Sequence, residues 1–292
     1  MPARRTVEPD MTRLAALCVG LTVLASCGSP KSPSSDGSGS KPDLGGGEYR
    51  TSGTVIDKGE GRPELCIGGV ADSYPPQCSG IPLIDWNWSD VEGEETSGQV
   101  SWGDYEITGR YDGKSLTVLE VGPPASPPPE SENPFESPCE EPPGGWEIPD
   151  PERTRESDWR LTIKAAEQAT DSSGAWIDYL GKEEPTEFGK NPVMLNLAFT
   201  GDLDDHEAEA RTTWGGALCV AEFERTFDRL REIQDEFGDT NEFGLEITYT
   251  DVNVMENVVQ IGVVVIGPAT LERIDERYGE GTVEVEAMLE PV

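Results

Sequence analysis

Six cysteines and a single histidine carry the most distinctive side-chain chemistry in this chain. Two of the cysteines, Cys66 and Cys78, flank the short run Ile-Gly-Gly-Val-Ala-Asp-Ser-Tyr-Pro-Pro-Gln. A structural zinc site needs four ligands, and two thiolates with no histidine nearby supply too few. A disulfide would close this short loop and stabilise the fold by about 3 kcal/mol. We therefore predict that Cys66 and Cys78 form a disulfide and that the chain holds no metal.

His206 is the histidine that any Ser-His-Asp or Cys-His mechanism would have to use. The zinc-protease pattern requires a second histidine four residues later, where this chain has Ala210. We interpret His206 as a solvated residue near the start of a helix. Asp202, Asp204 and Asp205 could hold a cation, but at a helix start they serve more simply as caps and as partners of the helix dipole.

The acidic loop at residues 85–95 fits a calcium-binding pattern at positions 1, 3 and 5 only, counted from Asp85. The sixth position should be glycine and the twelfth glutamate, whereas the chain has Asp90 and Thr96. Trp86 and Trp88 alternate along this segment, so both are expected to point to one side and to pack against a core.

The formal net charge is −35, from 57 acidic and 22 basic residues. This balance argues against nucleic acid as a partner, because binding it requires Lys and Arg to displace counterions. It also argues against attachment to anionic lipids through a basic patch. Pairs of carboxylates are unavoidable in such a chain, so their presence does not identify a glycosidase site.

The N-terminal segment has the features of an export signal. An apolar run at residues 14–26 is too short to span a bilayer, which needs about 20 residues. It ends in Leu24-Ala25-Ser26-Cys27, which resembles the lipobox of bacterial lipoproteins at all four positions. The resemblance implies that Cys27 receives a diacylglycerol, that residues 1–26 are removed as a signal peptide with Cys18 among them, and that Cys27 becomes the new N-terminus. Two acyl chains are enough for stable anchoring.

A Gly/Ser/Pro tract follows Cys27, and we expect residues 27–47 to be a disordered tether with a reach of about 25 Å. The sequence therefore predicts a protein on the outer face of the cell membrane, anchored by lipid. Translation from Met1 or from Met11 would give the same mature chain.

Residues 48–121 show short alternating runs separated by turn residues. The runs are at 49–56, 65–67, 83–86, 100–111 and 115–121. Asp112-Gly113 lies between the last two, which is the strongest local signal for a β-hairpin. We predict a small all-β domain, a barrel or sandwich of five or six strands.

Residues 122–138 are rich in proline and acids, and we expect an extended linker. A proline-rich run of this kind can also be the ligand of an aromatic groove in a partner protein. Cys139 follows, with Trp146 close behind, so the chain should be pinned to a folded domain here. With Cys27 lipidated and Cys66 paired with Cys78, the partner that remains for Cys139 is Cys219.

Residues 139–292 mix helical and strand patterns, which predicts an α+β domain with one sheet and helices on one side. Helices are expected after a cap at Thr154, at 202–212, at 221–237 and from Pro268 to Gly279. Strands are expected at 174–180, 193–199, 217–220, 245–251, 258–266 and 282–288. The fold class is therefore α+β, with a small all-β domain followed by a sheet-and-helix domain.

Four segments are similar to those of an uncharacterised class of exported lipoproteins from high-GC Gram-positive bacteria. They are PELCIGG at 63–69, SYPPQC at 73–78, WGGALCV at 214–220 and ERYGEGTVEVE at 276–286. The resemblance implies export and the two-domain division, and it implies no activity.

These observations together favour a membrane-anchored surface lipoprotein that acts as a non-catalytic binding or interaction module. Its ligand would be a protein or a small molecule, with no cofactor and no nucleic acid. The alternative is an envelope hydrolase that uses paired carboxylates.

Overall fold

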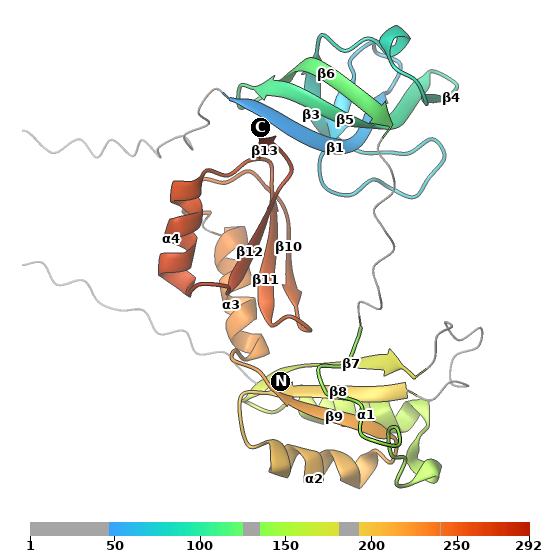
Figure 1. The fold of residues 1–292 in the computed structure, drawn as a ribbon, viewed down its shortest axis with the longest axis vertical. Helices are drawn as coiled ribbons and strands as arrows, with labels where there is room; N and C mark the ends of the chain where they lie inside the picture. Colours follow the sequence, from blue (N-terminus) through green and yellow to red (C-terminus); the bar gives the residue numbers. More distant parts are fainter. Residues whose placement is uncertain (1–46, 125–134, 181–192, 240) are drawn as a thin grey trace, which may run out of the picture. The chain divides into compact units, whose positions relative to one another are not determined.

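The computed structural model describes residues 47–124, 135–180, 193–239 and 241–292 (Figure 1). The expected signal peptide at 1–26, and the tether at 27–47 apart from its last residue, lie outside the described residues. The described residues form α-helices and strands, and the strands make up three sheets. The fold is therefore α+β, as the sequence predicts.

The first domain is a barrel. Strand β1 (Glu48–Asp57) pairs antiparallel with β5 (Val100–Tyr111) along its whole length. On its other side the order runs through β2 (Glu64–Cys66), β3 (Gly80–Ile84) and β6 (Leu116–Pro124), and β6 pairs with β5. These five strands therefore close on themselves in Greek-key fashion, which is the architecture of OB-type barrels. A short β4 (Glu95–Ser97) extends β5, and β6 continues into the segment expected as a linker.

Local sequence signals explain the turns of the barrel. The Asp112 carboxylate accepts hydrogen bonds from the backbone N–H of Lys114 and Ser115, at 2.9 and 2.8 Å. These bonds hold the pKa of Asp112 below its ordinary value, and Gly113 takes the positive φ of 90° that the hairpin needs. The predicted hairpin is confirmed.

Aromatic residues pack together at the core of the barrel. Trp86 packs on Tyr105 with ring centroids 5.0 Å apart, and Trp88 lies against Trp86 at 5.4 Å. Both indoles pack on the barrel core, as predicted, although Trp88 starts the 3₁₀ helix η1 (Trp88–Asp90) instead of continuing a strand.

The rest of the chain repeats one arrangement twice. The first αββαβ unit comprises α1 (Glu156–Ala166), β7 (Ser172–Tyr179), β8 (Val193–Phe199), α2 (Leu203–Thr213) and β9 (Ala217–Glu222). The second αββαβ unit comprises α3 (Phe227–Asp239), β10 (Ile247–Asn253), β11 (Val258–Val263), α4 (Pro268–Tyr278) and β12 (Val283–Ala287). In each unit the first strand is antiparallel to the second, and the second is parallel to the third across a helical crossover.

Three expectations for this region need correction. The single predicted sheet is two three-stranded sheets, because α3 separates β9 from β10 and each sheet forms a core with its own helices. The helix expected from residue 221 starts at Phe227, since residues 221 and 222 still belong to β9 and Arg225 is bound to Asn257. Thr154 does not cap α1. Its hydroxyl donates to the carbonyl of Pro151, in the 3₁₀ helix η2 (Pro151–Arg153), and Arg155 is the cap residue.

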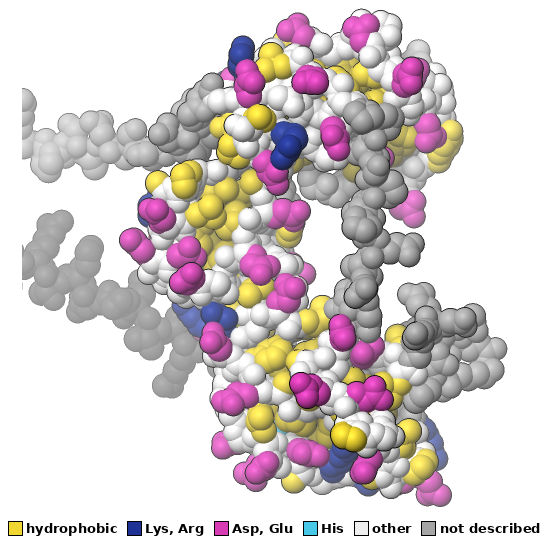
Figure 2. Space-filling model, viewed as in Figure 1, with side chains coloured by type: hydrophobic (Ala, Val, Ile, Leu, Met, Phe, Trp, Pro, Cys, Tyr) yellow, Lys and Arg dark blue, Asp and Glu magenta, His cyan; other side chains and the backbone are white. Residues whose placement is uncertain are grey.

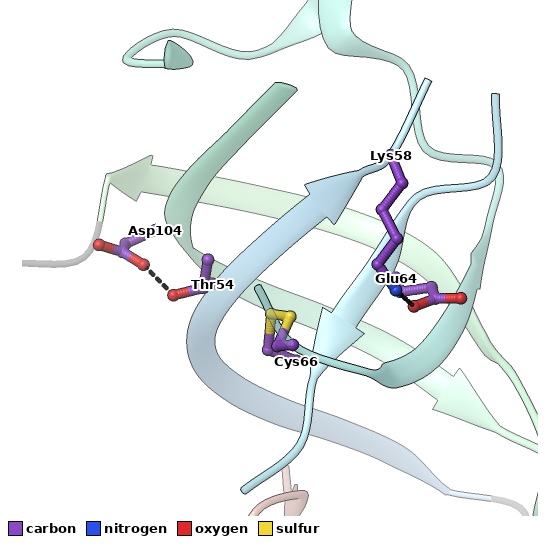
Figure 3. Close-up of a disulfide and its surroundings, with 6 residues drawn as sticks. Thr54, Lys58, Glu64, Cys66 and Asp104 are labelled. Atoms are coloured by element: carbon purple, nitrogen blue, oxygen red, sulfur yellow. Dashed lines mark hydrogen bonds and ion pairs between the residues drawn. A yellow bond between two sulfur atoms is a disulfide. The ribbon is translucent and has the colours of Figure 1, made fainter. Parts of the chain in front are cut away.

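Two disulfides join the pairs that the sequence predicts. Cys66 is bonded to Cys78 and Cys139 to Cys219, with Cα–Cα distances of 5.6 and 5.8 Å. The first closes the loop between β2 and β3 in the barrel (Figure 3). The second joins Cys139, in the segment before α1, to Cys219 in β9. It therefore attaches this segment to the first αββαβ unit.

The C-terminus belongs to the barrel, which the sequence did not predict. Strand β13 (Glu290–Pro291) pairs with β1, opposite Tyr49 and Arg50. Leu289 is fully buried in the barrel core together with Val264 and Val265, which directly follow β11 in the chain. The Tyr111 hydroxyl of β5 also donates to Glu246, at 3.2 Å. The second αββαβ unit is therefore joined to the barrel by residues that follow its strands β11 and β12 and are buried in the barrel core.

We predict that Leu289→Ala destabilises the barrel by about 2–5 kcal/mol, because it removes a fully buried side chain and leaves a cavity. Urea unfolding followed by tryptophan fluorescence measures the change. The matched control is Val292→Ala, whose side chain is 78% exposed and should cost less than about 0.5 kcal/mol. Equal small effects at both positions would contradict a structural role for the C-terminal strand.

Candidate binding site

A cavity of about 780 Å³ lies between the barrel and the second αββαβ unit. On the barrel side it is lined by residues 50–54 of β1, by Glu106 of β5 and by the loop that follows Cys66. On the other side it is lined by the face of β10, β11 and β12 that is not packed against helices, and by the chain leading into β13. This volume is within the range of about 300–1,000 Å³ that is usual for ligand sites.

The barrel wall of the cavity contains a stretch of β1 that has a strand on one side only. Tyr49 and Arg50 pair with β13, and Val55 and Ile56 pair with β2. Between them, residues 51–54 pair with β5 but with no second strand of the described chain. We call residues 51–54 the open stretch of β1.

The direction of its backbone groups follows from the hydrogen bonds beside it. The Glu48 carbonyl accepts from the Val292 N–H, so residue 48 directs its backbone groups toward β13. Alternate residues of an antiparallel strand direct their N–H and C=O to the same side. Ser52 therefore presents its backbone N–H and C=O to the cavity instead of to β5. Thr54 presents its N–H, whereas its carbonyl faces Cys66 in the pairing with β2.

The opposite wall contains a hydrogen-bonded row across three strands. Tyr249 of β10 is opposite Gly262 of β11, which is opposite Glu286 of β12. The Tyr249 hydroxyl donates to Glu286 at 2.6 Å. A Cβ on residue 262 would lie 2.2 Å from the Tyr249 ring, so glycine lets the ring lie flat across the central strand. This row fixes the position of the Glu286 carboxylate at the cavity.

Acidic groups dominate the charge of the cavity. Glu106, Glu286 and Glu290 line it, and Arg50 is the one basic residue among these described lining residues. Arg50 is 3.8 Å from Glu290, with both side chains 65% exposed, so this ion pair is weak. Glu284 lines an adjoining pocket together with Tyr249 and Glu286. Acidic side chains are also spread widely over the face seen in Figure 2.

The Cys66–Cys78 disulfide borders the same cavity. Cys66 is one of the lining residues, and Gly68 and Gly69 follow it in the wall. Close to the disulfide, the Thr54 hydroxyl donates to Asp104 at 2.5 Å, and Lys58 pairs with Glu64 at 2.9 Å (Figure 3). The disulfide therefore fixes the start of a glycine-containing loop at the edge of the cavity.

His206 lies elsewhere, and its interpretation as a solvated residue is wrong. Its Nε2 is 2.8 Å from the Asp171 carboxylate, its ring stacks on Phe199 at 3.6 Å, and its side chain is only 15% exposed. It borders a smaller cavity of about 170 Å³ between α1 and α2. Asp202 begins α2 without a capping hydrogen bond from its side chain. Packing on Phe199 and a hydrogen bond with Asp171 therefore account for this histidine.

The structure brings together few of the residues singled out from the sequence. Cys27 lies outside the described residues, and of the four disulfide cysteines only Cys66 borders the large cavity. Tyr249, Glu286 and the open stretch of β1 were missed. The alternation of Val283 and Val285 with acids is a signal that could have placed Glu284 and Glu286 on one face of β12. The pairing of Glu286 with Tyr249 depends on sheet register, which that signal does not contain.

None of the helices in the described residues has the length and apolarity to cross a bilayer. In the same residues, no group of three or more His, Cys, Asp or Glu side chains is placed to hold a metal ion.

Comparisons with known proteins assign no family. No protein-family model matches the chain, and no curated protein matches it significantly.

We predict that Tyr249 titrates at about pH 12. Its hydrogen bond to Glu286 and then its burial raise the pKa of Tyr249 to about 12, above the ordinary value near 10. A raised pKa means that this hydrogen bond stabilises the fold below about pH 10 and is lost as the pH rises through about 12. The difference between the ultraviolet pH titrations of wild type and Tyr249→Phe measures the transition. A midpoint near 10 would contradict the hydrogen-bonded row.

Proposed function

We propose that this chain is an exported lipoprotein, anchored to the outer face of the cell membrane through diacylglycerol on Cys27, whose folded part binds a ligand without catalysis. The binding claim depends on one observation, the cavity of about 780 Å³ between β1 and the uncovered face of the second αββαβ unit. Its volume suits a ligand, and its walls offer both side-chain carboxylates and free backbone groups.

Several features support the membrane location. Leu24-Ala25-Ser26-Cys27 follows an apolar run, and two disulfides are typical of proteins from oxidising compartments. The net charge of −35 gives the folded part no electrostatic attraction to anionic lipids. Attachment would therefore depend on the acyl chains alone.

For the anchor we predict that Cys27→Ser abolishes labelling of the protein by a radioactive fatty acid and moves it out of the membrane fraction, or leaves it held there only as an uncleaved precursor. Fractionation with immunoblotting, and mass spectrometry of the mature N-terminus, measure this. Cys18→Ser is the matched control and should leave lipid and location unchanged. A wild-type N-terminus without lipid on Cys27 would exclude the anchor.

For the cavity we predict that Gly69→Trp blocks ligand binding. Gly69 lines the cavity, and a side chain there meets no atom within 4 Å, so the indole can enter the cavity without disturbing the backbone. Site-specific photo-crosslinking at Ser52, in living cells, reports whether envelope material occupies the site. Gly201→Trp, at another uncrowded glycine, is the matched control and should crosslink like wild type.

A hydrolase assay distinguishes binding from the alternative, an envelope hydrolase. Glu106, Glu286 and Glu290 are the carboxylates that such an enzyme would use in this cavity. A hydrolase screen on the purified chain should give no turnover if the protein is a binding module. Turnover that disappears in Glu286→Gln while the fold is retained would favour the enzyme instead.

A further inference from the structure

The two αββαβ units differ in what covers the face of the sheet that is not packed against helices. In the first unit, α1 and α2 pack on the side of β8 that carries Leu195 and Leu197. Successive residues of a strand point to opposite faces, so Met194 and Asn196 lie on the other side. That side is covered by residues 135–146, a segment without helix or strand.

The contacts of this covering segment are specific. The Trp176 indole N–H donates to the Phe135 carbonyl at 3.2 Å. Cys139 is bonded to Cys219, and Trp146 packs beside Met194. A chain segment therefore lies over a row that contains Trp176, Asn196 and Cys219, which are opposite one another on β7, β8 and β9.

In the second unit the same order of strands leaves this face uncovered. Helices α3 and α4 pack on the side of Val259, Ile261 and Val263. The other side carries the row of Tyr249, Gly262 and Glu286, and this row lines the large cavity. Tyr249 is 40% exposed there. The face that the first unit covers with its own chain is thus accessible in the second.

The chemistry of the cavity restricts what can cover this face. Ser52 offers its backbone N–H and C=O, and Thr54 offers its N–H, from one side of a strand at a spacing that another extended backbone can match. Three carboxylates, from Glu106, Glu286 and Glu290, outweigh the single guanidinium of Arg50. A second copy of this chain, with a net charge of −35, is a poor electrostatic match.

We infer that the cavity binds a short, extended, basic peptide segment of a partner protein, which lies over the row of Tyr249, Gly262 and Glu286 and forms backbone hydrogen bonds with Ser52 and Thr54. This inference rests on the proposed binding function and specifies its ligand. Alternate side chains of the segment point to one side, so lysines or arginines at every second position face Glu286 and Glu106. Their charge is complementary to the cavity, and the backbone bonds select an extended conformation.

The test uses the full chain in detergent micelles and three capped, fluorescent peptides of about seven residues. In the first peptide lysine alternates with valine, in the second glutamate replaces lysine, and the third is the lysine peptide with alternate backbone nitrogens methylated. Fluorescence anisotropy at low and high salt gives the affinities. The lysine peptide should bind at least about tenfold more tightly than the glutamate peptide, with an affinity that falls as salt rises. Methylation should weaken binding about two- to tenfold.

Variants locate the binding. Glu286→Gln should weaken binding of the lysine peptide about two- to fivefold. Glu120→Gln, at an exposed position of β6 that does not line the cavity, should leave binding unchanged. Ser52→Pro removes an N–H that faces the cavity and no bond to β5, and it should weaken binding about two- to tenfold. If Ser52→Pro does not fold, the methylated peptide still tests the backbone bonds.

Each outcome decides the inference. Equal affinity for the lysine and glutamate peptides, or affinity that is insensitive to Glu286→Gln and to methylation, would overturn it. If no peptide binds while envelope material still crosslinks at Ser52 and is lost in Gly69→Trp, the inference fails and the proposed binding function stands. If neither occurs, both fail.

Discussion

The pairing of the C-terminal strand with β1 is the contact on which the cavity depends. Pro291 and Glu290 lie opposite Tyr49 and Arg50, and Leu289 is buried in the barrel core beside Val264 and Val265. Residues from the end of the chain thus help to fill the interior of a domain built at its beginning. The pairing of β1 with β13 ends at Arg50, and its pairing with β2 begins only at Val55. The open stretch of β1 lies between these two pairings.

Repetition of the αββαβ unit shows how one arrangement can serve two purposes. In the first unit, residues 135–146 and the Cys139–Cys219 disulfide cover the face of the sheet that is not packed against helices, which makes that face part of a core. The second unit carries polar and acidic residues on the corresponding face, with Tyr249 held across Gly262 by its bond to Glu286. A sealed face contributes stability, whereas a polar face beside a cavity is available for a ligand. The proposed function follows from this difference between the units.

Acidity has two consequences for the proposed protein. Carboxylates spread over the surface favour solubility and give no attraction to an anionic bilayer, so in the proposed function attachment depends on the lipid on Cys27. Inside the cavity, Arg50 is outweighed by Glu106, Glu286 and Glu290, and this charge is the basis for the proposed basic ligand. One compositional property therefore bears both on where the protein is held and on what it can bind.

The sequence by itself determined the local elements and the disulfide pairs. Strand β8 matches its predicted range of 193–199, the Asp112-Gly113 hairpin forms, and the class is α+β, because these features depend on periodicity and turn chemistry within a few residues. Tertiary structure alone decided that β9 and β10 belong to separate sheets, that residues 289–291 join the barrel, that His206 pairs with Asp171, and that Tyr249 meets Glu286. Each of these joins residues far apart in the chain. Periodicity shows which face of a strand is buried, but it does not show which strand lies beside it or what packs on that face.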